Sequence, residues 1–365
     1  MMKKIGIITY HRSINYGALL QAYALYTKIR SLGFECQIID YLSGPVEDDY
    51  RCRPRQRCFS WKNYFAHNLY CILHVKKKNK FIHFRKKIRM TPQIDASGLG
   101  AIAEEFDSFI TGSDQVFNPE SNRGDMAFLL SFVKDEKPRN AYSASIGSIT
   151  SFETMYDQNI SELRKFNNIS MREKNAAEYL SEKLNKECLY TVDPVWLLEK
   201  EEWSGFVSSQ KEKEYIFVYN LLDQKIMRDY VKGLSAKTGL KVVIINGTMI
   251  GEMIYMGIGK KASNSGPDEF LSLISNAKCI VTDSFHGTSF SIIFEKPFIA
   301  FPNMKNATNT NSRLNSLLHE CSLENRLYGG NSEPPMFDQI DYTSVKKRMK
   351  SNIDHSVEYL KQICE

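Results

Sequence analysis

Short apolar runs alternate with longer periodic stretches from the first residues of the chain onward. An apolar run at 4–10 precedes a polar loop, a periodic stretch from Gly17 to Gly33, and a second apolar run at 34–41. Short apolar runs bounded by turn residues predict strands, and apolar positions recurring about every 3.6 residues predict a helix. The start of the chain therefore predicts one βαβ unit.

The same alternation continues in two series. The first series predicts strands at 4–10, 34–41, 106–112, 140–147, 167–173 and 189–196. The second predicts strands at 214–220, 241–246, 278–284 and 297–301, with helices at 224–238, 267–277, 287–295 and 341–363. Alternating strands and helices form parallel sheets that bind ligands at the carboxyl ends of their strands. We predict an α/β protein of two Rossmann-like doubly wound domains, 1–200 and 201–365, that face a cleft, with the C-terminal helix in the second domain.

Composition fits two ordinary globular domains. The 365 residues are 42% hydrophobic and 25% charged, which excludes disordered, collagen-like and disulfide-dense proteins. The longest apolar stretches have only about eight residues, whereas a membrane-spanning helix needs about 20. The N-terminal apolar run is also too short for a secretory signal. We therefore expect a cytoplasmic protein whose eight scattered cysteines are reduced.

Basic side chains are concentrated in an insertion at residues 51–90, which is assigned to the first domain. It holds 13 of the 48 Lys and Arg residues and no acidic residue, which leaves 35 basic against 42 acidic side chains elsewhere. Aromatic rings lie among these cations: Trp61, Tyr64, Phe65, Tyr70, Phe81 and Phe84. The segment is either a solvated helical insertion or a peripheral membrane contact for anionic lipid or a lipid-linked substrate at the inner face of the membrane. Nucleic acid is disfavoured as a partner because no binding motif is present.

The most specific group of polar residues follows the predicted strand at 278–284. That strand delivers Asp283, Ser284 and His286 to its end, Gly287 permits a tight turn, and Thr288 opens a helix. A helix N-terminus favours an anion, and His286 would lie beside it. The alternative is that Asp283 or Ser284 only caps the helix and that His286 belongs to the core.

Two other turns carry candidate residues. Asn15 and Gly17 lie where the first strand turns into the first helix, at a phosphate-loop-like position that lacks a glycine-rich motif. Ser113, Asp114 and Gln115 directly follow another strand. Loops at strand ends often bind ligands, but these residue types also cap turns.

Further polar residues lie after the strands at 167–173 and 189–196 and on a helix near the end of the second series. Arg172, followed by Glu173, lies where a strand enters a helix, so its guanidinium either clamps a carboxylate or phosphate or forms a surface ion pair. Asp193 precedes a proline and is interpreted as a structural turn. Arg313 lies on a helix and faces either the cleft or solvent. We expect no metal site, since no cysteine or histidine cluster has ligand spacing.

Six motifs together resemble the polysaccharide pyruvyl transferase family in order and spacing. They are NYGALLQAYAL, FITGSDQVFN, AYSASIG, SMREKNA, TVDPVWLL and TDSFHGTSFSIIFEKPFIAF, and they cover about residues 4 to 318. The resemblance implies a two-domain fold similar to the glycosyltransferase B type. It also implies transfer of the pyruvyl group of phosphoenolpyruvate to a sugar hydroxyl pair, giving a ketal in surface polysaccharide or its lipid-linked precursor. Phosphoenolpyruvate is then a co-substrate, and no cofactor is expected.

The resemblance also implies residue roles. His286 would be the acid/base and phosphate contact, with Arg172 as the carboxylate or phosphate clamp. The other donor-binding residues would be Asp283, Ser284, Gly287, Thr288 and Arg313, and the acceptor-binding residues would be Asn15, Gly17, Ser113, Asp114 and Gln115. Many family members carry Arg-Leu-His-Gly where this chain has Ser-Phe-His-Gly at 284–287. Either Arg313 or Lys305 replaces the absent arginine, or the donor differs.

Two alternative functions remain open. A glycosyltransferase of the same architecture would use a nucleotide sugar and would need a carboxylate for the ribose hydroxyls, for which Glu269 is the candidate. A non-catalytic glycan-binding or membrane-binding protein would rely on the basic segment 51–90.

Overall fold

The computed structural model describes residues 3–44, 75–208, 214–222, 224–247, 257–304, 311–329 and 339–365. The chain divides into two compact units. Unit 1 consists of Met1–Arg51, Arg85–Leu198 and Lys350–Glu365, and unit 2 of Cys52–Phe84 and Glu199–Met349. The change from one unit to the other after Leu198 lies close to the boundary predicted at 200.

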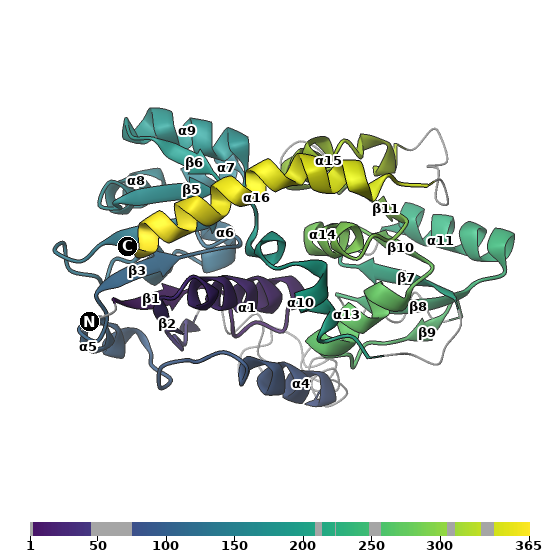
Figure 1. Ribbon diagram of the computed structural model, residues 1–365, viewed down its shortest axis with the longest axis horizontal. Coiled ribbons are helices and arrows are strands. Elements are labelled where there is room, and N and C mark those ends of the chain that lie inside the picture. The colour runs from purple at the N-terminus through teal and green to yellow at the C-terminus, as the bar shows by residue number, and fades with distance from the viewer. Residues whose placement is uncertain are drawn as a thin grey trace, which may run out of the picture. The chain divides into compact units, whose positions relative to one another are not determined.

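The end of the C-terminal helix belongs to unit 1, not to the second domain as predicted. Helix α16 (Tyr342–Cys364) passes from unit 2 into unit 1 at Lys350 (Figure 1). In unit 1, the Tyr359 hydroxyl donates to Ala141 O at 2.9 Å, and the Ser356 hydroxyl accepts from Val192 N at 3.0 Å. The end of α16 therefore completes the core of the first sheet.

The described part of the basic insertion begins with helix α4 (Val75–Arg85), most of which belongs to unit 2 rather than to the first domain. The buried Phe84 ring lies 5.5 Å from the ring of Phe206. On its exposed side, Lys80 Nζ forms an ion pair with Glu269 at 2.5 Å. Helix α4 is thus attached to unit 2 by apolar and ionic contacts, and the part of the insertion at 51–74 lies outside the described residues.

Unit 1 contains a six-stranded parallel sheet in the order β2-β1-β3-β4-β5-β6 (Figure 1). Its strands are β1 (Lys4–Ile8), β2 (Glu35–Ile38), β3 (Ser108–Thr111), β4 (Arg139–Ala144), β5 (Asn168–Met171) and β6 (Cys188–Tyr190). Its helices are α1 (Tyr16–Ser31), α5 (Leu99–Ala103), α6 (Pro119–Asn122), α7 (Ile149–Glu153), α8 (Tyr156–Leu163) and α9 (Lys174–Leu184). Short 3-10 turns are η1 (Ala96–Gly98), η2 (Met126–Leu129) and η3 (Pro194–Leu197).

Unit 2 contains a five-stranded parallel sheet in the order β11-β10-β7-β8-β9. Its strands are β7 (Tyr215–Asn220), β8 (Lys241–Asn246), β9 (Lys260–Lys261), β10 (Cys279–Thr282) and β11 (Phe298–Ala300). Its other helices are α10 (Lys200–Ser204), α11 (Lys225–Thr238), α13 (Pro267–Asn276), α14 (Phe285–Ile293), α15 (Ser312–Cys321) and the 3-10 turn η4 (Glu324–Arg326). The edge strand β9 was not predicted, because two lysines carry no apolar signal.

The central strands are buried on both faces, as in sheets covered by helices on both sides. Every residue of β3, β4, β7 and β10 is buried. Each unit has its own apolar core, with Phe109 and Phe117 in unit 1 and Val218 and Val281 in unit 2. Continuous apolar runs therefore predicted these strands correctly.

Both sheets are doubly wound, so each has one point at which the chain reverses its direction of travel across the sheet. This point lies between β1 and β3 in unit 1 and between β7 and β10 in unit 2. In open parallel sheets, ligands bind outside the carboxyl ends of the strands at such a point. None of the helices in the described ranges is long and apolar enough to cross a membrane.

Candidate functional site

The turn from β10 into α14 is built around Ser284. Its extended backbone makes it the N-cap of α14, and its hydroxyl accepts from Gly287 N at 3.2 Å. The Ser284 N–H in turn donates to Thr282 Oγ1 at 3.1 Å. The helix therefore begins at Phe285, two residues earlier than predicted, because a serine after a strand supplies the cap.

Asp283 connects this turn to the end of β7. Its two carboxylate oxygens accept hydrogen bonds from Leu221 N at 2.7 Å and Leu222 N at 2.8 Å. The carboxylate thereby satisfies two backbone donors in the loop that leaves β7. Asp283 was predicted as a donor-binding residue, and in the structure it holds together the two strand ends at the reversal point of unit 2.

Gly287 and Thr288 shape the turn from inside the helix. A Cβ on Gly287 would lie 2.4 Å from Thr282 Oγ1 and 3.0 Å from the Tyr219 ring. The glycine thus permits close packing of α14 on the sheet, whereas the sequence had suggested that it permits a tight turn. Thr288 is fully buried, and its hydroxyl donates to Ser284 O at 3.0 Å.

His286 is the second residue of α14, at the end where the helix dipole is positive. Its side chain is largely buried, and its ring meets that of Phe285 edge-on at 5.2 Å between centroids. The Ser284 hydroxyl accepts one hydrogen bond and retains its own proton to donate. An imidazole, a hydroxyl donor and a helix N-terminus therefore lie together in one turn.

Arg313 lies in the first turn of α15, which packs against α14. It is half-buried, so it faces neither the deep core nor open solvent. Asn311, two residues before Arg313, accepts a hydrogen bond from Asn303 N at 2.7 Å. This bond fixes the start of α15 beside the loop after β11. Lys305, the other candidate for the absent cation, lies outside the described residues.

In unit 1, Arg172 follows β5 and is surrounded by carboxylates. Nη1 donates to Asp193 Oδ2 at 2.8 Å, Nη2 to Asp114 Oδ1 at 3.4 Å, and Nε lies 3.6 Å from Glu173 Oε1. The Arg172 side chain is only 2% exposed. Burial acts to lower its pKa, but the charges of Asp114, Asp193 and Glu173 outweigh this effect and raise the pKa above its ordinary value. The interpretation of Arg172 as part of a surface ion pair is therefore wrong.

Asp193 connects three parts of unit 1. One oxygen accepts from Arg172 and, at 3.3 Å, from the Ser113 hydroxyl, while the other accepts from Val195 N at 3.1 Å. Asp193 thus caps η3, so residues 194–197 form a 3-10 turn rather than the predicted end of a strand. The sequence indicated this turn but gave no signal for the buried contact with Arg172.

Ser113, Asp114 and Gln115 follow β3 at the reversal point. Ser113 is fully buried, and its hydroxyl donates to Ser143 O at 2.7 Å, so it supports the loop from below. Asp114 has a positive φ of 70° and a partly exposed side chain. The Gln115 side chain accepts from Asn118 Nδ2 at 2.6 Å. Of the predicted acceptor residues in this loop, Asp114 and Gln115 reach the surface.

Asn15 and Gly17 begin α1 on the neighbouring strand. Asn15 is its N-cap and accepts from Ala18 N at 3.3 Å, and Gly17 is buried within the helix. The loop after β1 is joined to the loop after β3, because the Tyr10 hydroxyl donates to Gln115 O at 3.1 Å. The predicted acceptor residues thus lie along one edge of the unit 1 sheet.

A charged group that the sequence did not indicate lies at the same edge of the unit 1 sheet. His11 Nε2 lies 2.8 Å and Arg12 Nη1 2.6 Å from the same oxygen of Asp40, which follows β2. Burial acts to raise the pKa of Asp40, but the hydrogen bonds and charges of His11 and Arg12 outweigh it and lower the pKa to about 2. No local spacing could have predicted this group, since the chain segments meet only through the sheet.

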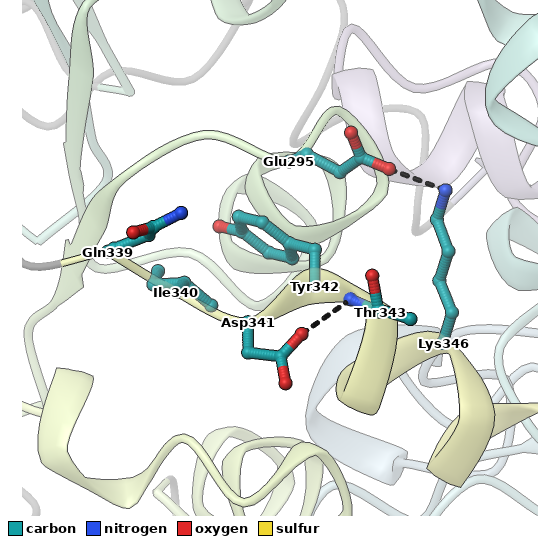
Figure 2. Close-up of a pocket in the computed structure, with 7 residues that line it drawn as sticks. All are labelled: Glu295, Gln339, Ile340, Asp341, Tyr342, Thr343 and Lys346. Carbon is teal, nitrogen blue, oxygen red and sulfur yellow. Dashed lines mark hydrogen bonds and ion pairs between the residues drawn. The ribbon is translucent and has the colours of Figure 1, made fainter.

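A surface cavity of about 450 Å³ lies elsewhere in unit 2. Figure 2 shows its lining residues, which are Glu295, Gln339, Ile340, Asp341, Tyr342, Thr343 and Lys346. Lys346 forms an ion pair with Glu295 at 2.5 Å. The cavity contains none of the residues predicted to act on substrate. Within the described ranges, no three His, Cys, Asp or Glu side chains are placed to hold a metal ion.

Comparisons with known proteins agree with this architecture. A family model for polysaccharide pyruvyl transferase matches residues 15–306. Among solved structures, the chain is similar to a candidate UDP-N-acetylglucosamine 2-epimerase from Listeria monocytogenes, with a TM-score of 0.55, 10% identity, and coverage of 99% of this chain and 91% of that chain. No curated protein matches the sequence.

Two further solved structures have a similar fold. They are the UDP-GlcNAc 2-epimerase from Neisseria meningitidis bound to UDP-GlcNAc (TM-score 0.51, 11% identity, 100% of this chain and 94% of that chain) and an α-glucosyltransferase in complex with UDP and a 13-mer DNA (TM-score 0.51, 10% identity, 100% and 95%). The predicted fold class, two parallel-sheet α/β domains similar to the glycosyltransferase B type, is confirmed.

Proposed function

The chain belongs to the polysaccharide pyruvyl transferase family, and we propose that it transfers the pyruvyl group of phosphoenolpyruvate to a pair of sugar hydroxyls in the synthesis of a surface polysaccharide. The observation that carries this proposal is the family match over residues 15–306. That range contains Asp114 and Arg172 in unit 1 and the turn with His286 in unit 2.

Binding of the donor is assigned to the turn between β10 and α14. Phosphoenolpyruvate carries a phosphate and a carboxylate, and a helix N-terminus favours such anions. Ser284 offers a hydroxyl donor there, and His286 offers an imidazole at the start of the helix. Asp283, Gly287 and Thr288 support this turn, and Arg313 is the described cation on the adjacent helix α15.

The reaction has a simple proton balance. Two sugar hydroxyls add to C2 of the pyruvyl group, and the bond from C2 to the phosphate oxygen breaks. One hydroxyl proton is balanced by the proton gained at C3, which becomes a methyl group, and the other by the proton taken up by the released phosphate. A group that both gives and takes protons is therefore required, and His286 fills this role in the proposal.

Binding of the acceptor sugar is assigned to the carboxyl edge of the unit 1 sheet. Asp114 and Gln115 are partly exposed there, and Asn15 lies on the adjacent loop after β1. Carboxylate and amide groups hydrogen-bond sugar hydroxyls. Ser113 and Gly17 are buried, so they are proposed to shape the acceptor surface from within.

The test is a transfer assay on the full chain. Purified protein is incubated with phosphoenolpyruvate and candidate lipid-linked or polymeric sugar acceptors, and phosphate release and the ketal product are measured. We expect phosphate release that depends on the acceptor. His286→Gln should abolish most of it, whereas His319→Ala is the matched control, because His319 is an exposed histidine paired with Glu324. Full activity of His286→Gln would contradict the proposed role of His286.

A nucleotide-sugar glycosyltransferase is the second candidate, since the α-glucosyltransferase of similar fold is in complex with UDP. The carboxylate expected to bind ribose is engaged elsewhere, because Glu269 accepts from Gly266 N at 2.5 Å and pairs with Lys80. Calorimetric titration separates the two candidates. Saturable binding of phosphoenolpyruvate without binding of UDP favours the pyruvyl transferase, and the reverse result favours the glycosyltransferase.

A peripheral membrane contact is proposed for the exposed face of α4. Val75 and Ile82 on this helix are 48% and 37% exposed, which is unusual for large apolar side chains. Lys76 and Lys80 are also exposed on this helix. Apolar groups flanked by cations suit an anionic lipid surface. Sedimentation with phosphatidylserine vesicles tests this contact, and we expect Ile82→Asp to weaken it without loss of transfer to a soluble acceptor.

A further inference from the structure

Asp114 is the member of the Arg172 ionic cluster that reaches solvent. Its side chain is 14% exposed, whereas the side chains of Arg172, Glu173 and Asp193 are 2%, 4% and 0% exposed. The cluster contains three carboxylates and one guanidinium. Burial of such a charged group is costly. Within this cluster, Asp114 is the carboxylate that a ligand in solvent can reach.

One oxygen of Asp114 is held and the other is available. Oδ1 accepts from Gln115 N at 3.0 Å and from Arg172 Nη2 at 3.4 Å. Among the residues that the structure describes, no hydrogen bond or ion pair involves Oδ2. A carboxylate fixed through one oxygen presents the other in a defined direction, as required of a group that takes a proton from a bound hydroxyl.

The backbone of Asp114 is held in an unusual conformation. Its φ of 70° lies in the left-handed region, which few residues other than glycine adopt and in which aspartate is one of the more frequent exceptions. The carbonyl of Asp114 accepts from Ser145 N at 2.9 Å and from Val116 N at 2.8 Å, which fixes this conformation against β4. Such conformations persist where the surroundings determine them, and they are frequent at functional sites.

The guanidinium of Arg172 contacts the Asp114 carboxylate and is too deeply buried to be offered to a substrate. Its side chain is almost fully buried, and its two terminal nitrogens donate to Asp193 and Asp114. Asp193 is itself fixed by Ser113 and Val195. The sequence had suggested that Arg172 clamps the donor, but the geometry connects it to Asp114.

We propose that Asp114 is the proton acceptor for the attacking sugar hydroxyl, and that Arg172 and Asp193 are positioning residues for it; this inference rests on the proposed pyruvyl transfer. The hydroxyl oxygen forms a bond to C2 of the pyruvyl group as its proton passes to Asp114. The C2–C3 double bond is consumed as C3 gains a proton from His286, which in this scheme gives a proton and regains one from solvent. The second hydroxyl then displaces phosphate at C2, its proton leaves with the phosphate, and Asp114 returns its proton to solvent.

The first test removes the negative charge of Asp114 but keeps the shape of its side chain. We expect Asp114→Asn to lower kcat about 100-fold or more, the usual range for loss of a general base. We also expect it to remove the fall of kcat at acidic pH, while the KM for phosphoenolpyruvate changes little. Asp95→Asn is the matched control, because Asp95 is an exposed aspartate that caps a short turn through Ser97. An Asp114→Asn variant with unchanged kcat and pH profile would overturn the proposal.

The second test separates positioning from substrate binding. Arg172→Lys keeps a positive charge but cannot hold Asp114 and Asp193 with one planar fork. We expect kcat to fall about tenfold or more with an unchanged KM for phosphoenolpyruvate. A raised KM for phosphoenolpyruvate at unchanged kcat would make Arg172 a donor clamp and would overturn the proposal.

Two further measurements distinguish loss of the base from loss of folding. Circular dichroism identifies a variant that does not fold, and Asp114→Glu then replaces Asp114→Asn in the assay. The longer side chain should lower kcat but retain its fall at acidic pH, and wild-type kcat in Asp114→Glu would count against a positioned base. Wild-type protein that transfers no pyruvyl group to any acceptor would overturn both the proposed function and this inference, whereas active wild type with active Asp114→Asn would overturn the inference alone.

Discussion

The carboxyl edges of the two sheets hold their polar side chains by different means. In unit 1, Asp114 and Asp193 are held by the buried guanidinium of Arg172. In unit 2, Asp283 and Ser284 are held by backbone N–H groups. The unit 2 residues lie at the reversal point of their sheet, whereas the unit 1 group extends from Asp114, after β3, to Arg172 and Asp193, after β5 and β6.

This difference has consequences for stability. Removal of one partner from a buried ionic group leaves unpaired charge, which costs about 3–5 kcal/mol. Removal of an acceptor from backbone N–H groups near the surface costs less, since water replaces part of the lost bond. The unit 1 edge should therefore depend more strongly on each side chain and on pH than the unit 2 edge.

The largest effect is expected for His286, and it should concern activity rather than stability. His286→Ala should lower kcat about 100-fold to 10,000-fold, the range for an acid/base group, because it removes the imidazole that is assigned to proton transfer in this turn. The thermal midpoint should change little. Steady-state kinetics and thermal unfolding of His286→Ala, with His319→Ala as control, check this result. A large loss of stability with normal kcat would make His286 a core residue.

The second prediction compares the two edges directly. Arg172→Ala should lower the free energy of unfolding by about 3–5 kcal/mol, because it leaves buried carboxylates unpaired. Asp283→Ala should lower it by only about 1–3 kcal/mol, the cost of two unsatisfied N–H groups. Urea denaturation of both variants measures the difference. Equal losses would contradict the distinction between charged and backbone-based positioning.

The third prediction concerns packing behind the unit 2 turn. Gly287→Ala should cost about 1–3 kcal/mol, since the added Cβ would lie 2.4 Å from Thr282 Oγ1. Gly233→Ala in α11 is the matched control: nothing lies within 4 Å of its added Cβ, so it should stabilise the protein by about 0.5–1 kcal/mol. Chemical denaturation of the two variants checks both signs. A stabilised Gly287→Ala variant would show that α14 does not require this close approach.

The smallest effect is expected for the Asp40 group of unit 1. The pKa of Asp40 is lowered from 3.8 to about 2, so its contribution to stability is complete above pH 4 and is lost as pH falls toward 2. Asp40→Asn should cost about 1–2 kcal/mol at pH 7 and less at pH 2. Unfolding as a function of pH checks this. A cost that is independent of pH would mean that Asp40 acts through packing and not through its charge.

Local sequence was sufficient for the elements and for both candidate turns. Apolar runs predicted β7 and β10, and the polar residues after β3, β5 and β10 supplied the candidate site residues. Serine, asparagine and aspartate caps were visible as well, because a cap depends on a few adjacent residues. The turn at Asp193 was also predicted, but the start of α14 was placed two residues too late, because the Ser284 cap shifts it by less than one helical turn.

Contacts between distant segments were decided by the tertiary structure. Arg172 meets Asp114, 58 residues away, and His11 meets Asp40, 29 residues away. The sequence also placed all of the C-terminal helix in the second domain, whereas its end packs in unit 1. A parallel sheet brings together the ends of strands that are remote in the chain, and no local pattern encodes which ends become neighbours. The sequence by itself therefore determined which residues stand at the strand ends, and only the assembled sheets decided which partners they have.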